Sequence, residues 1–254
     1  DLKKNDSKGM FKIYDEWPEI ANNSFDKEFE KLDVDNIDHI VFAGMGGSGS
    51  VGDVLGSILS KEDIHINNVK GYLLPKTVDS KTLVIATSVS GNTSETLSIL
   101  KSVKETSANT ACFSSGGLMK EYCKNNNIFF QKIPMVHSPR ASFPSFLYSI
   151  LNILEPILPI KSNDIHESIS ALEKTKKNIF SGNLTTENQS LELAKFTNGI
   201  TCIYHPSGLQ SAAIRYKNPL QENAKNHAMV ENVIESSHNG IVAWENKSIV
   251  KPVL

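Results

Sequence analysis

The stretch Val41–Asp53, "VFAGMGGSGSVGD", decides the fold because a glycine-rich turn in it joins an apolar run to a helical pattern. The spacing Gly44-x-Gly46-x-x-Gly49 is that of the turn that holds a pyrophosphate in dinucleotide-binding folds. The question raised by this turn is whether it binds a dinucleotide or another ligand that carries phosphate.

Strand-like and helical patterns alternate after this turn. A leading helix or helix pair is predicted over residues 8–33, with an interruption at Pro18. Helices are expected over the segment after the glycine turn and at 94–105 and 117–125. Strands are predicted at 39–44, 69–74, 81–88, 108–115 and 127–133. This alternation predicts an α/β fold with a doubly wound parallel sheet of the flavodoxin-like order 2-1-3-4-5.

The alternation restarts in the last third of the chain. A hydrophobic helix at 144–158 and an amphipathic helix at 163–180 come first, followed by a strand within 199–208 and a helix at 209–225. The remaining length leaves room for about two strands, which is too few for a full lobe. We therefore expect residues 1–160 to form an N-terminal helix plus a first α/β domain, and residues 161–254 to form a linker helix and an incomplete second α/β lobe.

Composition excludes several classes of protein. A formal net charge of -2 over 254 residues shows no excess of positive charge of the kind that binds nucleic acid or an anionic membrane. The three cysteines fit no metal or redox spacing, so packing thiols in a reducing compartment are expected. The most apolar region, 143–160, is broken by Asn152, Glu155 and Pro156, and the N-terminus is too charged for a secretory signal. A cytoplasmic enzyme or binding protein that needs no metal is the expectation.

The dinucleotide interpretation lacks its supporting residue. A dinucleotide fold places an acidic residue about 20 residues after the glycine turn, where it holds the ribose hydroxyls. No Asp or Glu occurs between Ile64 and Val78. This absence argues against an NAD(P) oxidoreductase.

A second loop, Ala86–Thr96 "ATSVSGNTSET", follows the third predicted strand and is rich in hydroxyl groups. Asn92 is a favourable N-cap, and Glu95 three residues later completes a pattern like a capping box, so a helix should begin here. The first free backbone N–H groups of that helix, with the flanking hydroxyls, would bind an anion.

The two loops should face one crevice. In the order 2-1-3-4-5 the first and third strands are neighbours, and ligands bind at their carboxyl ends. Two uncharged, hydroxyl-rich loops suit a small phosphate monoester better than a dinucleotide, although two ordinary capped turns remain the alternative. The predicted binding residues are Gly46, Gly47, Ser48, Ser88, Ser90 and Thr93.

Five segments together resemble a known family. "GMGGSG" and "SGNTSET" are similar to the sugar isomerase (SIS) domain, which binds phosphosugars. Three later segments are similar, in order and spacing, to the bifunctional phosphoglucose/phosphomannose isomerases. They are "SPRASFPSFLY" (138–148), "RYKNPLQENAK" (215–225) and "ESSHNGIVAW" (235–244).

The resemblance implies an aldose–ketose isomerase that interconverts glucose 6-phosphate and mannose 6-phosphate with fructose 6-phosphate through a cis-enediol. It assigns proton transfer to Glu222, ring opening to His238 and stabilisation of the enediolate to Arg140, with no cofactor. Without it, Glu222 would be read as an exposed helix residue near Lys225, His238 as a turn residue, and Arg140 as a surface or ion-pair arginine.

The resemblance also leaves questions open. Val89 replaces an aromatic residue that is common in the family, and an active-site lysine and threonine of the family cannot be assigned, because Lys247 and Lys251 come too early. In related sugar isomerases the histidine comes from the partner subunit, so a homodimer with shared active sites is expected. The alternatives are a non-catalytic phosphosugar-sensing module and an isomerase for another phosphosugar, such as an amino sugar.

Overall fold

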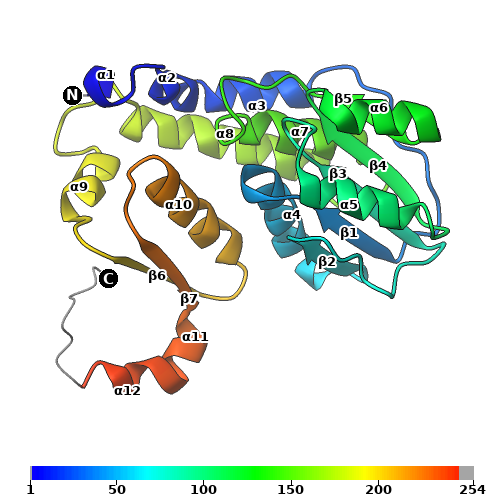
Figure 1. Ribbon diagram of the computed structural model, residues 1–254. Coiled ribbons are helices and arrows are strands. Elements are labelled where there is room, and N and C mark those ends of the chain that lie inside the picture. The colour runs from blue at the N-terminus through cyan, green and yellow to red at the C-terminus, as the bar shows by residue number, and fades with distance from the viewer. Residues whose placement is uncertain (1, 246–254) are drawn as a thin grey trace. The chain divides into compact units, whose positions relative to one another are not determined.

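The computed structural model describes residues 2–245, which divide into two compact units, residues 2–181 and 182–245 (Figure 1). The sequence analysis placed the boundary at 160/161. The helix α8 (Ser162–Ile179), expected to link the domains, packs on α3 (Trp17–Phe25) and belongs to the first unit.

The first unit is built on a five-stranded parallel sheet of the order β2-β1-β3-β4-β5. The predicted doubly wound topology is therefore confirmed. The second strand lies a few residues before the expected 69–74, because the chain leaves the sheet after Val69. The strands are β1 (His39–Ala43), β2 (His65–Val69), β3 (Thr82–Thr87), β4 (Asn109–Ser114) and β5 (Phe129–Lys132).

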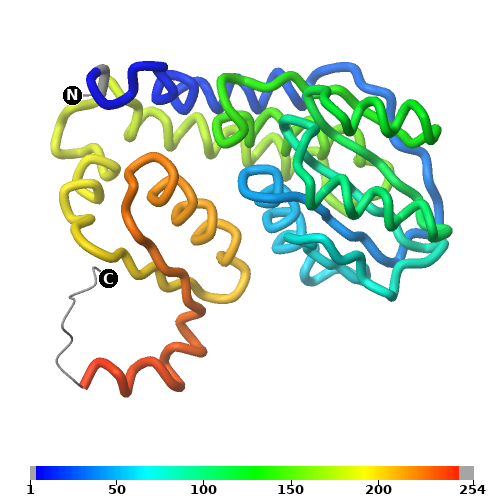
Figure 2. The backbone as a smooth tube through the Cα atoms, viewed as in Figure 1, coloured from blue at the N-terminus to red at the C-terminus, as the bar shows by residue number. Residues whose placement is uncertain are grey.

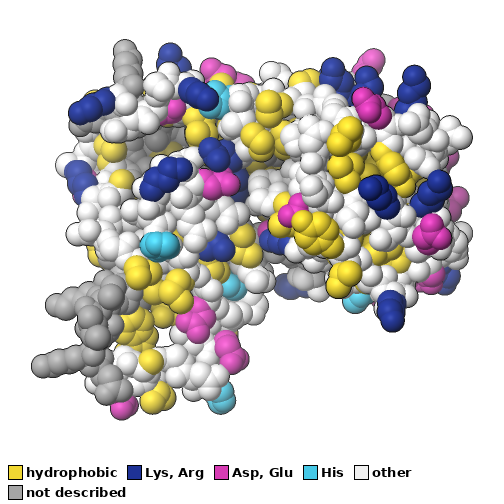
Figure 3. Space-filling model, viewed as in Figure 1, with side chains coloured by type: hydrophobic (Ala, Val, Ile, Leu, Met, Phe, Trp, Pro, Cys, Tyr) yellow, Lys and Arg dark blue, Asp and Glu magenta, His cyan; other side chains and the backbone are white. Residues whose placement is uncertain are grey.

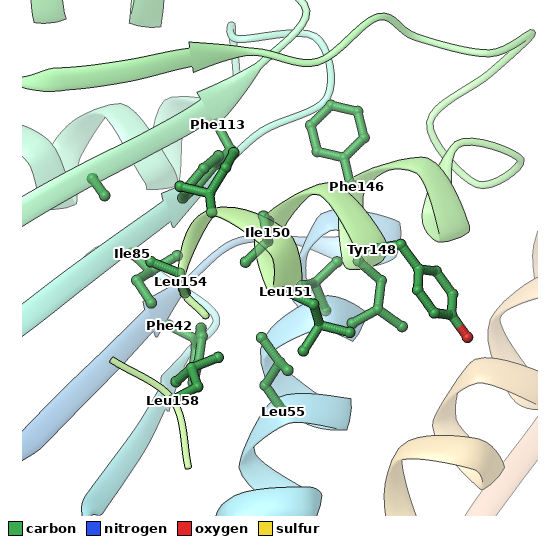
Figure 4. Close-up of a cluster of buried hydrophobic side chains, with 14 of the residues drawn as sticks. Phe42, Leu55, Ile85, Phe113, Phe146, Tyr148, Ile150, Leu151, Leu154 and Leu158 are labelled. Carbon is green, nitrogen blue, oxygen red and sulfur yellow. The ribbon is translucent and has the colours of Figure 1, made fainter. Parts of the chain in front are cut away.

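Helices cover both faces of this sheet because the central strands are apolar on both sides. On one face Phe42 and Ile85 pack with Leu55 of α4 (Gly46–Ile58) and Ile150 of α7 (Phe143–Ile153), as Figure 4 shows, while α3 and α8 extend the same core. The other face is covered by α5 (Ser94–Val103) and α6 (Gly117–Asn126).

Two cysteines lie in the core under α6. Cys112 of β4 and Cys123 of α6 are free thiols and pack with Met119. A hydrogen bond with Cys123, together with burial, raises the pKa of the Cys112 thiol. Both act as packing residues, as the sequence suggested.

The N-terminal segment is less helical than expected. Helices end at Phe25, whereas the predicted helical region extends to residue 33. Pro18 does not interrupt a helix but lies in the first turn of α3, where a missing backbone N–H costs nothing. The short elements of the first unit are α1 (Leu2–Asn5), α2 (Met10–Asp15) and the 3₁₀ turn η1 (Leu59–Lys61).

The second unit contains a parallel pair of strands, β6 (Thr201–His205) and β7 (Ala228–Asn232). The two strands match the number that the sequence allowed for an incomplete lobe. One helix, α9 (Gln189–Phe196), was not predicted; Asn188 caps it through bonds from the N–H groups of Ser190 and Leu191. The other helical elements are α10 (Gln210–Glu222), α11 (Val233–Glu235), η2 (Ser236–Gly240) and α12 (Ile241–Ala243).

Among the helices of residues 2–245, none has the length and apolar character needed to cross a bilayer. On the face drawn in Figure 3, Lys, Arg, Asp and Glu side chains alternate over the surface, in agreement with the small formal net charge of -2.

Candidate functional site

The glycine loop (residues 44–49) comprises the connection after β1 and the first residues of α4, at the carboxyl edge of the sheet. Gly46 has φ 53°, a left-handed conformation that favours glycine, and no atom lies within 4 Å of the position a Cβ would take. At Gly47 a Cβ would lie 3.2 Å from the carbonyl oxygen of Pro139 and 3.4 Å from the Cα of Arg140. The glycine loop is thus open at Gly46 and packed on the Arg140 segment at Gly47.

Ser48 joins the glycine loop to the loop after β3. Its buried Oγ accepts a hydrogen bond of 3.1 Å from the backbone N–H of Val89. The two loops were expected to face one crevice, and this bond joins them. The Oγ of Ser48 therefore has a partner within the protein that links the two loops.

The loop after β3, here called the serine loop (residues 88–93), is held by its own hydroxyls. The fully buried Oγ of Ser88 accepts from the N–H of Gly91 at 3.1 Å and lies 2.8 Å from the Oγ1 of Thr93. Ser90 is exposed, and its Oγ accepts from the N–H of Asn92 at 3.2 Å. Exposed Ser90 and half-buried Thr93 are therefore more accessible to a ligand than Ser88.

The start of α5 differs from the sequence prediction. Asn92 was expected to cap this helix, but the N-cap is Thr93, and no side chain bonds to the first turn. The Oγ1 of Thr93 instead contacts Ser88, and the Oδ1 of Asn92 accepts from the N–H of Leu118. The first-turn N–H groups of α5, which lack partners within the helix, are thus left without a side-chain cap.

Arg140 lies in a turn that three parts of the first unit hold in place. The Oγ of Ser142 donates to the carbonyl oxygen of Ser138 at 2.8 Å, and the indole N–H of Trp17 donates to the carbonyl oxygen of Ala141 at 3.1 Å. Gly47 packs against the turn from the other side. The backbone of the half-buried Arg140 thus lies next to Gly47 of the glycine loop.

Glu222 and His238 lie in the second unit, at opposite ends of β7. Glu222 ends α10, and the bond of 3.2 Å from Nε2 of Gln221 to the carbonyl oxygen of Ala228 ties that end of α10 to the start of β7. His238 lies in η2, which follows β7 and the short helix α11; Figure 1 labels β7 and α11, and Figure 2 traces the same chain path. Both side chains are exposed, and the five residues of β7, about 15 Å in length, separate the end of α10 from the segment that carries His238.

Two further residues singled out in the sequence, Lys247 and Lys251, lie outside the described residues. Within residues 2–245, no group of three or more His, Cys, Asp and Glu side chains lies as metal ligands would. A cavity of about 10 Å³ beside the glycine loop, lined by Ser48, Lys70 and Thr87, has room for about one water molecule and none for a sugar.

The chain is similar in sequence to a known family of sugar-phosphate isomerases. Residues 186–254 match the model of the bacterial phospho-glucose isomerase C-terminal SIS domain. The bifunctional phosphoglucose/phosphomannose isomerase of Aquifex aeolicus is 30% identical over 230 residues, which cover 89% of this chain and 68% of that protein. The chain belongs to the bifunctional phosphoglucose/phosphomannose isomerase family. The resemblance carried by the five segments is confirmed.

Two further relatives show how much of this chain is similar to known proteins. The Caldicellulosiruptor bescii protein of the same name is 34% identical over 221 residues, or 84% of this chain. The chain spans 64% of the length of that relative. A D-glucosamine-6-phosphate 4-epimerase from Sulfolobus acidocaldarius is 27% identical over 239 residues, which cover 94% of this chain and 74% of that protein.

Solved structures agree on the fold. The C-terminal domain of glucosamine-fructose-6-phosphate aminotransferase from Francisella tularensis aligns with a TM-score of 0.66 and 17% identity, covering 92% of this chain and 72% of that chain. A tagatose-6-phosphate ketose/aldose isomerase from Escherichia coli aligns with a TM-score of 0.63 and 15% identity, over 93% of this chain and 70% of that one. These likenesses concern architecture alone.

Two parts of this family member's site were missed by the sequence analysis. One is Trp17, whose tie to the Arg140 turn spans 124 residues and leaves no local pattern. The other is the loop after β4, residues 114–118, which contacts the serine loop. Its "SSGG" letters could have been read as a third turn at the same edge of the sheet.

Proposed function

We propose that the protein interconverts glucose 6-phosphate and mannose 6-phosphate with fructose 6-phosphate through a cis-enediol intermediate. The observation that carries this proposal is the contact between Gly47 and the Arg140 turn, beside the joined glycine and serine loops. It supports a site in which backbone N–H groups and the Arg140 guanidinium would both reach an anionic substrate. The names of the relatives identify the phosphosugar class.

The phosphate group would bind at the serine loop. The uncapped first turn of α5 supplies N–H donors, and Ser90 and Thr93 supply hydroxyls at the open side. Ser48 and Ser88 hold the two loops in this shape through bonds to the Val89 and Gly91 N–H groups. In this proposal Ser90 and Thr93 contact the phosphate, whereas Ser48 and Ser88 support the loops. The sequence prediction had all four hydroxyls bind phosphate directly.

The isomerisation moves one proton between C2 and C1. In the proposed mechanism His238 moves the proton that opens the sugar ring, and Glu222 removes the C2 proton and returns it to C1. Negative charge develops on the enediolate oxygens between these steps, and the Arg140 guanidinium stabilises it. Exposed Glu222 and His238 are accessible to substrate in the second unit.

Trp17→Phe is expected to lower kcat about tenfold while KM stays within about twofold. Phenylalanine keeps an aromatic ring between Tyr14 and Phe143 but cannot donate to the carbonyl oxygen of Ala141, so the Arg140 turn loosens. Steady-state kinetics on the full-length protein measure the effect. The matched control is Tyr122→Phe, which removes a bond of 3.3 Å to the Leu100 carbonyl oxygen away from Arg140. Equal kinetics for both variants would contradict a role for Trp17 in positioning Arg140.

A second function is favoured by one observation. The Sulfolobus acidocaldarius relative, whose name is D-glucosamine-6-phosphate 4-epimerase, matches 94% of this chain, a larger share than either isomerase described above. Amino-sugar chemistry therefore competes with glucose and mannose 6-phosphate as the activity of this chain. A non-catalytic phosphosugar sensor would need the phosphate loops alone.

The decisive experiment is a coupled assay of the full-length protein with glucose 6-phosphate and mannose 6-phosphate, alongside glucosamine 6-phosphate followed by NMR. Formation of fructose 6-phosphate from the first two sugars is expected. Conversion of the amino sugar alone would replace the proposal with the epimerase alternative. Binding of all three sugars without turnover would indicate a sensor.

A further inference from the structure

The loop after β4, here called the buttress loop (residues 114–118), is bonded directly to the serine loop. The carbonyl oxygen of Val89 accepts two bonds from Ser115, one from its N–H at 3.0 Å and one from its Oγ at 2.7 Å. The Oδ1 of Asn92 accepts from the N–H of Leu118 at 3.0 Å, and the carbonyl oxygen of Gly91 accepts from the N–H of Met119 at 2.9 Å. The serine loop is thus bonded to the buttress loop and the start of α6 as well as to Ser48.

Two of these bonds cap a helix that has no cap of its own. The N-cap of α6 is Gly116, which has no side chain to accept a bond from the first turn. Leu118 and Met119 lie in that first turn, and their N–H groups are satisfied by Asn92 and Gly91 of the serine loop. The N-terminus of α6 is therefore capped from outside, by the loop proposed to bind phosphate.

Steric contacts fix the same arrangement. A Cβ at Gly117 would lie 2.5 Å from the carbonyl oxygen of Ser90 and 2.6 Å from the Oδ1 of Asn92. Such distances leave no room for a side chain at this junction. Glycine at position 117 therefore allows Ser90 and Asn92 to lie directly against the start of α6.

The direction in which Asn92 points has a consequence for α5. An Asn side chain just before a helix usually accepts from the helix's own first N–H groups. Here Asn92 faces α6, and Thr93, the residue at the N-cap of α5, directs its Oγ1 to Ser88. The first turn of α5 keeps its donors for a ligand.

We propose that Asn92 is a positioning residue that keeps the N-terminus of α5 open for the substrate phosphate by capping α6 instead. This inference rests on the proposed function, in which the serine loop binds the phosphate group. Without the Asn92–Leu118 bond, the serine loop loses one of its anchors on the buttress loop, and its donors are less well arranged before the ligand arrives.

Asn92→Ala is expected to weaken binding of inorganic phosphate about fivefold to tenfold, the range that loss of one hydrogen bond gives. Titration calorimetry on the full-length protein measures this affinity without turnover. With substrate, KM should rise by a similar factor while kcat stays within about twofold, because the role proposed for Asn92 is in phosphate binding and not in proton transfer.

The control variant is Asn126→Ala. It removes a bond of 2.8 Å from Nδ2 to the carbonyl oxygen of Tyr122 at the other end of α6. We expect Asn126→Ala to bind phosphate like the wild type. If Asn92→Ala lowered only the thermal stability, Asn92 would be merely structural and the proposal would fall.

A second measurement tests whether phosphate binding at the serine loop affects the buttress loop through Asn92. Phosphate is expected to slow amide hydrogen exchange in a peptide covering residues 114–119 of the wild type and of Asn126→Ala, but not of Asn92→Ala. Wild-type protein that binds phosphate, with Asn92→Ala unchanged in both readouts, would overturn the role of Asn92 and leave the proposed function standing. Wild-type protein that does not bind phosphate would overturn both.

Discussion

Mixing full-length Glu222→Gln and His238→Asn proteins is expected to restore about a quarter of the wild-type turnover, although each variant alone should lose about 10²–10⁴-fold. The reason lies in the second unit. Glu222 ends α10 near the start of β7, whereas His238 lies beyond the end of that strand. An enediol mechanism needs both groups within reach of adjacent carbons and oxygens of one sugar.

A symmetric dimer resolves this separation if each active site takes Glu222 from one subunit and His238 from the other. Random exchange of the two variants then gives about half mixed dimers, each with one intact site and one doubly substituted site. The proteins are unfolded together, refolded and assayed, with each variant refolded alone as the control. Failure to regain activity, with mixed dimers shown by mass spectrometry, would place both groups in one subunit's site.

Gly91→Ala is expected to destabilise the protein by about 2–5 kcal/mol and to abolish phosphate binding. Gly91 has φ 72°, and a Cβ there would lie 1.8 Å from the carbonyl oxygen of Gly116. An alanine must therefore push the serine loop away from the buttress loop, breaking the bonds at Asn92 and Ser115. Urea unfolding measures the stability, and calorimetry with inorganic phosphate measures the binding.

The matched control for this substitution is Gly71→Ala. No atom lies within 4 Å of the position its Cβ would take, and its φ lies outside the left-handed region. We expect Gly71→Ala to change the free energy of unfolding by about 0.5 kcal/mol or less. Similar losses in the two variants would mean that Gly91 matters through backbone flexibility and not through its contact with Gly116.

Much of the first unit could be predicted from the sequence. The strands and helices around the glycine loop appear as local patterns, and once their order is known the topology brings the ends of β1 and β3 together. The weak strand was misplaced, because the polar stretch 65–69 has no apolar periodicity and forms β2 on the edge of the sheet by pairing with β1.

The side-chain directions could not be predicted in this way. Local sequence suggested that Asn92 caps α5, since the pattern Asn92-x-x-Glu95 is a capping signal. The competing partner, the N–H of Leu118, lies 26 residues further along the chain. Likewise the hydroxyl of Ser48 is used by the N–H of Val89, 41 residues away.

The sequence by itself determined the parallel sheet, the two loops at its carboxyl edge and the family to which the chain belongs, because periodicity and motif spacing are local properties. Only the tertiary structure decided which hydroxyls face inward, that Trp17 holds the Arg140 turn, and that Glu222 and His238 lie at opposite ends of β7. These features depend on hydrogen bonds and strand directions that form when segments distant in the sequence pack together. Such contacts produce no regular spacing of residues in the sequence, so they could not be predicted from it.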